Sequence, residues 1–457
     1  MNVLLINPPG KVSFVSPPLG ILYIAAALKE AGHTVTVLDF ALEQLDNISL
    51  SKVINENDIR MVGISVVTPK VYQAIELAEY IKKEHPSITI ATGGPHATLV
   101  PERLLKDCAS IDYVVQGEGE LRLNALIERL ESRANPEGLD GIAFLRDGEL
   151  INTPPTSFIS DLNALPMPDR ELIDIERYSN YLKTSASPAT TMMTSRGCPY
   201  RCIYCSKPVT GEKLRVTTPK KVIKELLHLK NEYGIKEIIF YDDSFTLNKR
   251  RAMEICDLMI ENKLDIKWQC ETRVNLVTEE LLQKMKDAGC YMVAFGIESG
   301  SDRVLKILKK GVTTEQVERA MGFAKKVGIH VVGYFMLGIP GETVDEIKET
   351  IRFAKKLNPD YAQFAVATAF PGTELYKMAK ADNKINDDWS KSIYALGGKP
   401  AVSLSDVPID TLDEYVKKAY RAFYFRPGYI LKKLSRIRSF KDIAYNLKGL
   451  KTLLKIS

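Results

Sequence analysis

The sequence predicts an α/β protein with a doubly wound N-terminal domain, a partial (β/α)6 barrel and a mostly helical C-terminal region. Short β-branched runs alternate with amphipathic helical patterns, first in residues 1–140 and again in residues 188–380. The 457 residues are enough for several domains, and 45% hydrophobic with 26% charged residues is typical of globular proteins. We expect a hairpin and linker at 141–187 and a C-terminal region at 381–457.

The first region reads as a parallel sheet with helices on both faces. Strands are predicted at Val3–Ile6, Thr34–Leu38, Met61–Val67, Ile88–Ala91 and Tyr113–Val115, and helices at Leu19–Ala31, Val71–Glu84 and Leu121–Leu130. Ligands of such sheets bind beyond the carboxyl ends of the strands. The residues expected there as ligand contacts are Asn7, Pro8, Ser65, Gly93, Gly94, Gly117 and Glu118.

A hairpin with an Asp147-Gly148 turn and a proline-bearing linker, 154–168, precede the second alternation. Strands are predicted at Met192–Met193, Glu237–Tyr241, Ile266–Cys270, Tyr291–Phe295, His330–Met336 and Tyr361–Ala367. Helices are predicted between them at Pro219–Glu232, Lys249–Glu261, Thr278–Ala288, Thr314–Lys326 and Thr343–Lys356. Six β/α units of this kind indicate a partial barrel with its active face at the strand C-termini.

Three cysteines, Cys198, Cys202 and Cys205, follow the first barrel strand with the spacing Cys-x3-Cys-x2-Cys. Three thiolates in one loop can hold three irons of a [4Fe–4S] cluster and leave the fourth iron open. A closed zinc site is the alternative, but it needs four ligands, and the nearest downstream candidates are His228 and Cys256. The remaining cysteines lie in apolar surroundings and are expected in the core: Cys108, Cys256, Cys270 and Cys290.

This cysteine loop at the mouth of a partial barrel resembles the radical S-adenosylmethionine enzymes, over roughly residues 190–380. The resemblance implies that S-adenosylmethionine binds the open iron and is cleaved reductively to a 5′-deoxyadenosyl radical. It also implies cofactor contacts at Asp242 and Asp243 for the methionine ammonium, Glu298 and Ser299 for the ribose, Gly338 and Ile339 near the adenine, and the aromatic residue Tyr204.

Some of these residues also have simpler interpretations. Asp243 could cap a turn, and Glu298 could cap the N-terminus of a helix. Arg273, just past the third barrel strand, is either a clamp for a carboxylate or an exposed charge. The placement of Asp243 and Glu298 at successive strand ends favours the cofactor contacts for these two residues, whereas both interpretations of Arg273 stay open.

The N-terminal domain resembles cobalamin-binding domains, because Ser65-Val66-Val67 and Gly93-Gly94 each follow a strand. Small residues there let a corrin or its nucleotide tail approach the backbone. The loop at residues 7–13 contains no histidine, so the cobalt is expected to lack a histidine lower ligand from this loop. We expect His96 to face solvent rather than to bind the cobalt.

Together the two resemblances imply a cobalamin-dependent radical S-adenosylmethionine enzyme, from the branch that includes class B methyltransferases and the anaerobic oxidative cyclase. We expect a C-methyltransferase that moves a methyl group from methylcobalamin to an unactivated carbon of a small-molecule or lipid-like substrate. An anaerobic reducing partner such as flavodoxin or ferredoxin is implied. The alternatives are an oxidative cyclase or ring-rearranging enzyme without methyl transfer, and a non-enzymatic corrinoid or Fe–S sensor.

Charge is concentrated at the C-terminus. Nine basic residues against one acid in 426–457 give +8, which leaves −3 for the rest of a chain of net charge +5 and argues against nucleic-acid binding. Apolar residues at three- and four-residue steps from Tyr429 to Ile456 predict a basic amphipathic helix. It could lie on an anionic membrane or pack on the barrel. Without a long apolar segment or leader, a cytoplasmic location is expected, with membrane association through this tail as an option.

Overall fold

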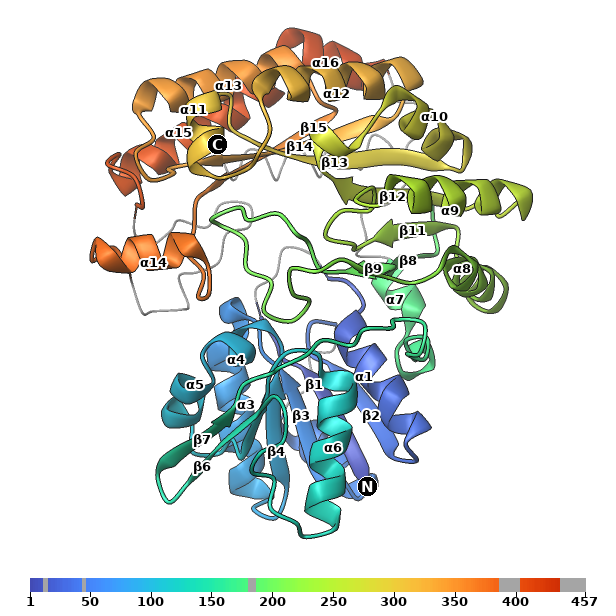
Figure 1. Ribbon diagram of the computed structural model, residues 1–457, viewed down its shortest axis with the longest axis vertical. Helices are drawn as coiled ribbons and strands as arrows, with labels where there is room; N and C mark the ends of the chain where they lie inside the picture. The colour runs from blue at the N-terminus through green and yellow to red at the C-terminus, as the bar shows by residue number, and fades with distance from the viewer. Residues whose placement is uncertain (11–14, 43–46, 180–185, 386–402, 436–457) are drawn as a thin grey trace. The chain divides into compact units, whose positions relative to one another are not determined.

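The computed structural model describes residues 1–10, 15–42, 47–179, 186–385 and 403–435, and it divides into two compact units (Figure 1). The first unit contains Met1–Pro199, Ser206–Asp243 and Leu258–Lys267. The second contains Tyr200–Cys205, Ser244–Asp257 and Trp268–Ser457. Within the described residues, no helix has the length and apolar character needed to cross a membrane.

The first unit is built on a seven-stranded sheet of order β2-β1-β3-β4-β5-β6-β7. Its strands are β1 (Asn2–Asn7), β2 (Thr34–Asp39), β3 (Met61–Ser65), β4 (Thr89–Gly93), β5 (Tyr113–Val115), β6 (Ile142–Arg146) and β7 (Glu149–Thr153). The first five are parallel, as the sequence predicts. The hairpin β6–β7 adds an antiparallel edge, because Asp147 and Gly148 adopt the positive φ of a tight turn and Val115 pairs with Ile142. The structure therefore joins to the first sheet a hairpin that the sequence grouped with the linker.

Helices cover this sheet on both faces (Figure 1). They are α1 (Leu19–Glu30), α2 (Asn47–Glu56), α3 (Val71–Glu84), α4 (Pro95–Leu99), α5 (Pro101–Asp107) and α6 (Gly119–Glu131). Helices α1 and α6 pack against each other, and their buried side chains join Val3, Leu5 and Met61 of the sheet in one core. Helices α2, α4 and α5 are short and were not predicted from the sequence.

The rest of the first unit consists of a 3₁₀ turn before α3, of short helices in the predicted linker, and of the first strands and helix of the predicted partial barrel. It contains η1 (Thr68–Lys70), η2 (Arg170–Leu172), α7 (Ile175–Ser179), β8 (Ala189–Met192), β9 (Ser195–Arg196), β10 (Arg215–Val216), α8 (Pro219–Tyr233) and β11 (Glu237–Phe240). Strands β8 and β11 are parallel, whereas β9 and β10 form a short antiparallel ribbon. The cysteine loop begins directly after β9, so this ribbon determines where the loop starts.

The second unit contains four parallel strands, β12 (Lys267–Thr272), β13 (Cys290–Glu298), β14 (His330–Leu337) and β15 (Tyr361–Val366). The helices of this part of the chain are α9 (Lys249–Glu261), η3 (Val274–Leu276), α10 (Glu279–Asp287), α11 (Asp302–Ile307), α12 (Thr314–Val327), α13 (Val344–Leu357), α14 (Glu374–Ala381), α15 (Ile409–Tyr424) and α16 (Pro427–Leu434). Capping boxes at Thr313 and Thr343 start α12 and α13. The predicted strands and helices of the partial barrel, and a helical C-terminal region, are confirmed; residues 436–457 of the predicted tail helix lie outside the described residues.

Candidate active site

Cys198 is anchored within the first unit by the segment that follows the cysteine loop. The backbone N–H of Cys198 donates to the carbonyl of Gly211 at 3.3 Å, and the carbonyl of Cys198 accepts from Lys207 Nζ at 2.8 Å. The preceding Gly197 has a φ of +89°, and a Cβ there would lie 2.3 Å from the carbonyl oxygen of Lys213. Only glycine therefore fits immediately before this cysteine.

Cys202 and Cys205 belong to the second unit, where Cys202 is buried and Cys205 is exposed. A turn joins them, because the N–H of Cys205 donates to the carbonyl of Cys202 at 3.0 Å. The three loop cysteines are free thiols, and the four cysteines predicted for the core are all buried, as expected. Among the described residues, no three His, Cys, Asp or Glu side chains converge on a position for one metal ion. In a [4Fe–4S] cluster each cysteine binds its own iron, so it needs a wider arrangement than a single ion.

Arg273 is buried and lies against Cys202, so its interpretation as an exposed charge was wrong. Its guanidinium stacks 3.6 Å from the ring centroid of Tyr200, and Nη1 donates to Cys202 Sγ at 3.5 Å. Nη2 also donates to the carbonyl of Lys310. The Arg273 guanidinium therefore places a fixed positive charge directly beside one of the three loop cysteines.

Glu298, Tyr204 and Lys310 form a buried polar group in the same unit. Glu298 Oε1 accepts hydrogen bonds from Tyr204 at 2.9 Å and from Lys310 Nζ at 2.7 Å, and Lys310 also donates to Tyr204 at 2.9 Å. Burial and the neighbouring Glu298 charge raise the pKa of Tyr204 well above its usual range. Glu298 does not cap a helix, since Ser301 caps α11.

Glu298 has a φ of +68°, and the backbone makes room for this group of side chains. A Cβ on Gly296 would lie 2.6 Å from Glu298 Oε1 and 2.7 Å from Lys310 Nζ. A non-glycine residue with positive φ is strained, and such strain is concentrated at functional sites. Lys310 was not identified from the sequence, because a Lys-Lys-Gly sequence after a helix is typical of a solvent-exposed turn.

Asp242 and Asp243 hold the chain that leads into the cysteine loop. Asp242 accepts from Thr194 N and Oγ1 and from Ser195 N, and Asp243 Oδ2 accepts from Gly197 N at 3.2 Å. Burial raises the pKa of Asp243 above its ordinary value. The structure thus gives both aspartates a turn-holding role, and their contact with the methionine ammonium stays a prediction.

Ser299 and the Gly338–Ile339 segment are also fixed by their neighbours. Ser299 is fully buried, and its hydroxyl lies 3.1 Å from Thr350 Oγ1. Glu342 Oε2 accepts from Gly338 N at 2.6 Å and from Ile339 N at 3.1 Å. The structure therefore gives the Ser299 hydroxyl a partner within the protein, while Glu342 fixes the backbone of the loop.

The first unit contains a cavity of about 230 Å³ at the carboxyl ends of its strands. The predicted ligand contacts that line it are Ser65, Gly93, Gly94, Gly117 and Glu118. Gly94 has a φ of +92°, and a Cβ there would lie 3.1 Å from the carbonyl oxygen of Val66. Helix α1 contributes the apolar side chains of Leu19, Ile21 and Ile24 and the ring of Tyr23 to the cavity wall.

Asn7 and Pro8 do not line this cavity and instead contact a buried lysine. Lys70 Nζ donates to Asn7 Oδ1 at 3.1 Å and to the carbonyl of Pro8 at 2.9 Å. Asn7 in turn donates to Asp39 Oδ1 at 2.7 Å. Burial lowers the pKa of Lys70 below its ordinary value.

The expectation that His96 faces solvent was wrong. Gly94 and Pro95 start α4, which turns the imidazole inward, where Nδ1 lies 3.1 Å from Thr68 Oγ1. Burial lowers the pKa of His96 to about 4, so the ring is neutral at physiological pH.

The arrangement within each unit fits the cofactors that the sequence implies. In the second unit, two free thiols, one of them beside a buried guanidinium, are suitable ligands for an iron–sulfur cluster. In the first unit, a mostly apolar cavity bordered by glycines lets a ligand approach the backbone closely, as the small residues of a cobalamin-binding domain do.

Two family models match the chain: the radical SAM superfamily at residues 192–354 and the B12 binding domain at residues 10–127. An uncharacterized methyltransferase of Pyrococcus horikoshii is 38% identical over 96% of this chain and 96% of its own length. The anaerobic magnesium-protoporphyrin IX monomethyl ester cyclase of Rubrivivax gelatinosus is 30% identical over 82% of this chain and 70% of its own length.

Among solved structures, the cobalamin-dependent S-adenosylmethionine radical enzyme OxsB, with aqua-cobalamin and S-adenosylmethionine bound, has the same fold. It is superposed with a TM-score of 0.78 at 19% identity, over 99% of this chain and 70% of that one. The cofactors of the family are a [4Fe–4S] cluster, S-adenosylmethionine and cobalamin. The chain is therefore a radical S-adenosylmethionine enzyme of the family that carries an N-terminal B12-binding domain.

Proposed function

We propose that this enzyme transfers a methyl group from cobalamin to an unactivated carbon of a small-molecule substrate. The observation that carries the proposal is the buried group of Tyr204, Glu298 and Lys310, which lies in the same unit as Cys202 and Arg273. A relative of nearly equal length that is named a methyltransferase supports the reaction type. When bound, the cluster, S-adenosylmethionine and cobalamin supply the radical and the methyl group.

The protein's part in this reaction is to bind, orient and exclude water. We assign cluster binding to Cys198, Cys202 and Cys205, with Arg273 holding positive charge beside the second thiol. Glu298 is held by two donors on Oε1, so its second carboxylate oxygen, for which no protein partner is described, would accept a hydrogen bond from a ribose hydroxyl when S-adenosylmethionine is bound.

Further contacts are proposed for the backbone and for the first unit. Gly338 and Ile339 present a loop that Glu342 fixes, which suits contact with an adenine ring. In the first unit we assign the glycine-bordered cavity to the cobalamin.

A second candidate function is oxidative cyclisation without methyl transfer, because a cyclase is 30% identical over most of this chain. The protein, reconstituted anaerobically with iron, sulfide and hydroxocobalamin, should be given S-adenosylmethionine and a reductant such as flavodoxin. Formation of both 5′-deoxyadenosine and S-adenosylhomocysteine supports a methyltransferase. Formation of 5′-deoxyadenosine alone supports the cyclase. If neither product forms, the enzymatic proposal is refuted.

We also propose that the substrate is lipid-like and that the C-terminus contacts an anionic membrane. Three apolar side chains of α16 are exposed, Ile430, Leu431 and Leu434. Its two lysines are engaged on β15 and the loop before it, since Lys432 pairs with Asp360 at 3.2 Å and Lys433 lies 3.8 Å from the ring centroid of Tyr361. Binding of the full chain to phosphatidylserine vesicles, and not to neutral vesicles, is the expected result; equal binding to both would refute an electrostatic contact.

A further inference from the structure

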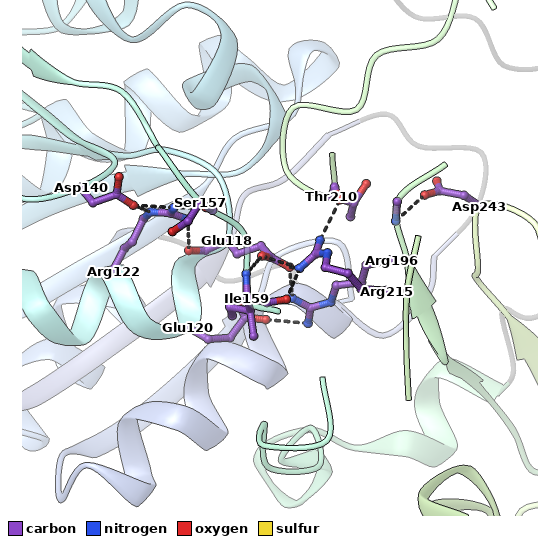
Figure 2. A network of polar contacts seen from close by, with 11 residues as sticks. Glu118, Glu120, Arg122, Asp140, Ser157, Ile159, Arg196, Thr210, Arg215 and Asp243 are labelled. Carbon is purple, nitrogen blue, oxygen red and sulfur yellow. Dashed lines mark hydrogen bonds and ion pairs between the residues drawn. The ribbon is translucent and has the colours of Figure 1, made fainter. Parts of the chain in front are cut away.

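A buried ionic cluster lies in the first unit between α6 and the β9–β10 ribbon (Figure 2). We call it the Glu118 cluster; it consists of Glu118, Glu120, Arg196 and Arg215. None of the four is more than 7% exposed. Two carboxylates and two guanidinium groups balance each other, so the cluster is neutral as a whole.

Glu118 is the centre of this cluster. Oε1 accepts from Arg196 Nη1 and from Arg215 Nη1, both at 2.8 Å. Oε2 accepts from Arg215 Nη1 at 2.8 Å and from the backbone N–H of Ile159 at 2.7 Å. Both carboxylate oxygens are thus used by the protein, which leaves Glu118 poorly suited to the direct cofactor contact expected from the sequence.

The two arginines lie opposite each other on the ribbon that precedes the cysteine loop. Arg196 in β9 pairs with Arg215 in β10, and Cys198 comes two residues after Arg196. Arg196 Nη2 donates to Glu120 at 2.6 Å, and Arg215 Nη2 donates to the carbonyl of Thr210 at 2.7 Å. Although burial alone would lower it, the charge of Glu120 helps to hold the pKa of Arg196 above its ordinary value.

The other side of the cluster faces the cavity assigned to cobalamin. Glu118, Glu120 and Arg196 all line that cavity, in which most of the other lining side chains are apolar. The loop that carries Glu118 is itself fixed, because Arg122 Nη1 donates to the Glu118 carbonyl at 3.1 Å. Arg122 is held in turn by Asp140, with Nη2 to Oδ2 at 2.7 Å (Figure 2).

This arrangement is more specific than general stabilisation requires. Guanidinium groups with several simultaneous acceptors fix orientation as well as distance. The hydrogen bonds of Arg196 and Arg215 all end at backbone or carboxylate atoms, which belong to the cavity wall, the linker or the segment that follows the cysteine loop. A rigid connection therefore runs from the cavity wall to the residue that precedes Cys198 by one position, Gly197.

We propose that Glu118 is a positioning residue. Through Arg196 and Arg215 it fixes the β9–β10 ribbon relative to the cavity wall, and it thereby fixes the Cys198 end of the cysteine loop. The inference rests on the proposed function, because it takes Cys198 as a cluster ligand and the cavity as the cobalamin site. Glu118 acts here through the arginines and does not touch the reacting atoms.

The test compares Glu118→Gln with a matched control, Glu225→Gln, in the full-length protein. Glu225 is also buried and paired with a buried arginine of the first unit, since it accepts from Arg170 Nη1 at 2.9 Å. Its pair does not involve the ribbon. Both changes remove one buried carboxylate charge, so a loss of general stability should be similar in the two variants.

Two readouts separate positioning from stability. In the metal-free protein, the rate at which iodoacetamide modifies Cys198, measured by peptide mass spectrometry, should rise several-fold in Glu118→Gln and stay unchanged in Glu225→Gln. In the reconstituted protein with S-adenosylmethionine and dithionite, 5′-deoxyadenosine formation should fall on the order of 100-fold in Glu118→Gln at unchanged iron content. Electron paramagnetic resonance of the reduced cluster should change in the same variant only.

Wild-type cleavage of S-adenosylmethionine tests the proposed function, whereas the variants test the inference. If Glu118→Gln shows wild-type modification of Cys198 and wild-type cleavage, the positioning role is refuted. The positioning role is also refuted if Cys198 modification and cleavage change equally in both variants, since the Glu118 cluster would then contribute only stability. If Glu118→Gln does not fold, Arg215→Lys replaces it, because it keeps the buried charge but loses the multiple contacts of the guanidinium, and the same outcomes apply.

Discussion

Replacing Glu342 by glutamine should change how the stability of this protein depends on pH. Glu342 is only 2% exposed, and among the described residues its Oε1 has no hydrogen-bond partner. Burial raises the pKa of Glu342 to about 7, even though two backbone N–H groups of the Gly338–Ile339 loop donate to its other oxygen. The charged form is therefore disfavoured in the folded state.

The magnitude follows from the two pKa values. A rise from 4.5 in the unfolded chain to about 7 in the folded one corresponds to about 3 kcal/mol. Between these values the folded protein binds more protons than the unfolded chain, so the free energy of unfolding falls as pH rises. Below pH 4.5 the carboxyl is protonated in both states, so the cost of ionising it in the folded protein is absent. Above about pH 7 this cost lowers the free energy of unfolding in full.

The assay is urea unfolding of the full-length, cofactor-free chain at about pH 5 and about pH 8, since these lie near the two ends of the interval. The buried Trp268 of the second unit provides a fluorescence signal. The advantage of Glu342→Gln over the wild type should grow by about 2–3 kcal/mol between the two pH values.

Glu346 provides the control for this experiment. Its hydrogen bond to Arg303 lowers the pKa of Glu346 to about 2, so it is ionised at both pH values. Glu346→Gln should therefore lower the free energy of unfolding by the same amount at both pH values. If the difference between wild type and Glu342→Gln were equal at both pH values, the carboxyl would be ionised throughout and the reasoning would fail.

Three further changes test the proposed site. Cys202→Ala should abolish the visible absorbance of the reconstituted cluster and the cleavage of S-adenosylmethionine; cleavage at the wild-type rate would exclude the iron ligand assignment. Lys310→Met should lower stability by about 3–5 kcal/mol in thermal or urea unfolding, because it leaves a buried carboxylate unpaired, whereas the adjacent exposed Lys309→Met should cost under about 1 kcal/mol. Gly94→Ala should weaken hydroxocobalamin binding in a spectrophotometric titration more than Gly138→Ala does. Both glycines have a positive φ, but only a Cβ on Gly94 would lie against other atoms. Equal losses of affinity in the two variants would indicate that backbone strain alone is responsible.

The fold could be predicted from the sequence because its signals are local. Strands such as β5 are short apolar runs, and helices such as α3 repeat apolar residues on one face, so the boundaries of both agree with the structure to the residue. Helix α4 was missed because five residues cannot show a helical period, and that omission also led to the wrong environment for His96.

The candidate site was only partly predictable because its contacts are not local. The loop cysteines and Glu298 stand in recognisable short motifs. The partners of Glu118, in contrast, are arginines 78 and 97 residues away, and no spacing rule connects them. Lys310 shows the same difficulty, since a lysine becomes a buried hydrogen-bond donor only when folding brings a carboxylate to it.

The lysine beneath the first loop of the N-terminal sheet also limits how this enzyme could be redesigned. A Cβ on Gly10 would lie 2.8 Å from Cγ of Lys70, in the middle of that side chain rather than at its flexible end. A histidine grafted at position 10 as a cobalt ligand would have to displace a lysine that already holds Asn7 and Pro8. Conversion to a histidine-ligated corrinoid protein at this position therefore requires at least two coordinated substitutions, and a single replacement should distort the loop before it supplies a ligand.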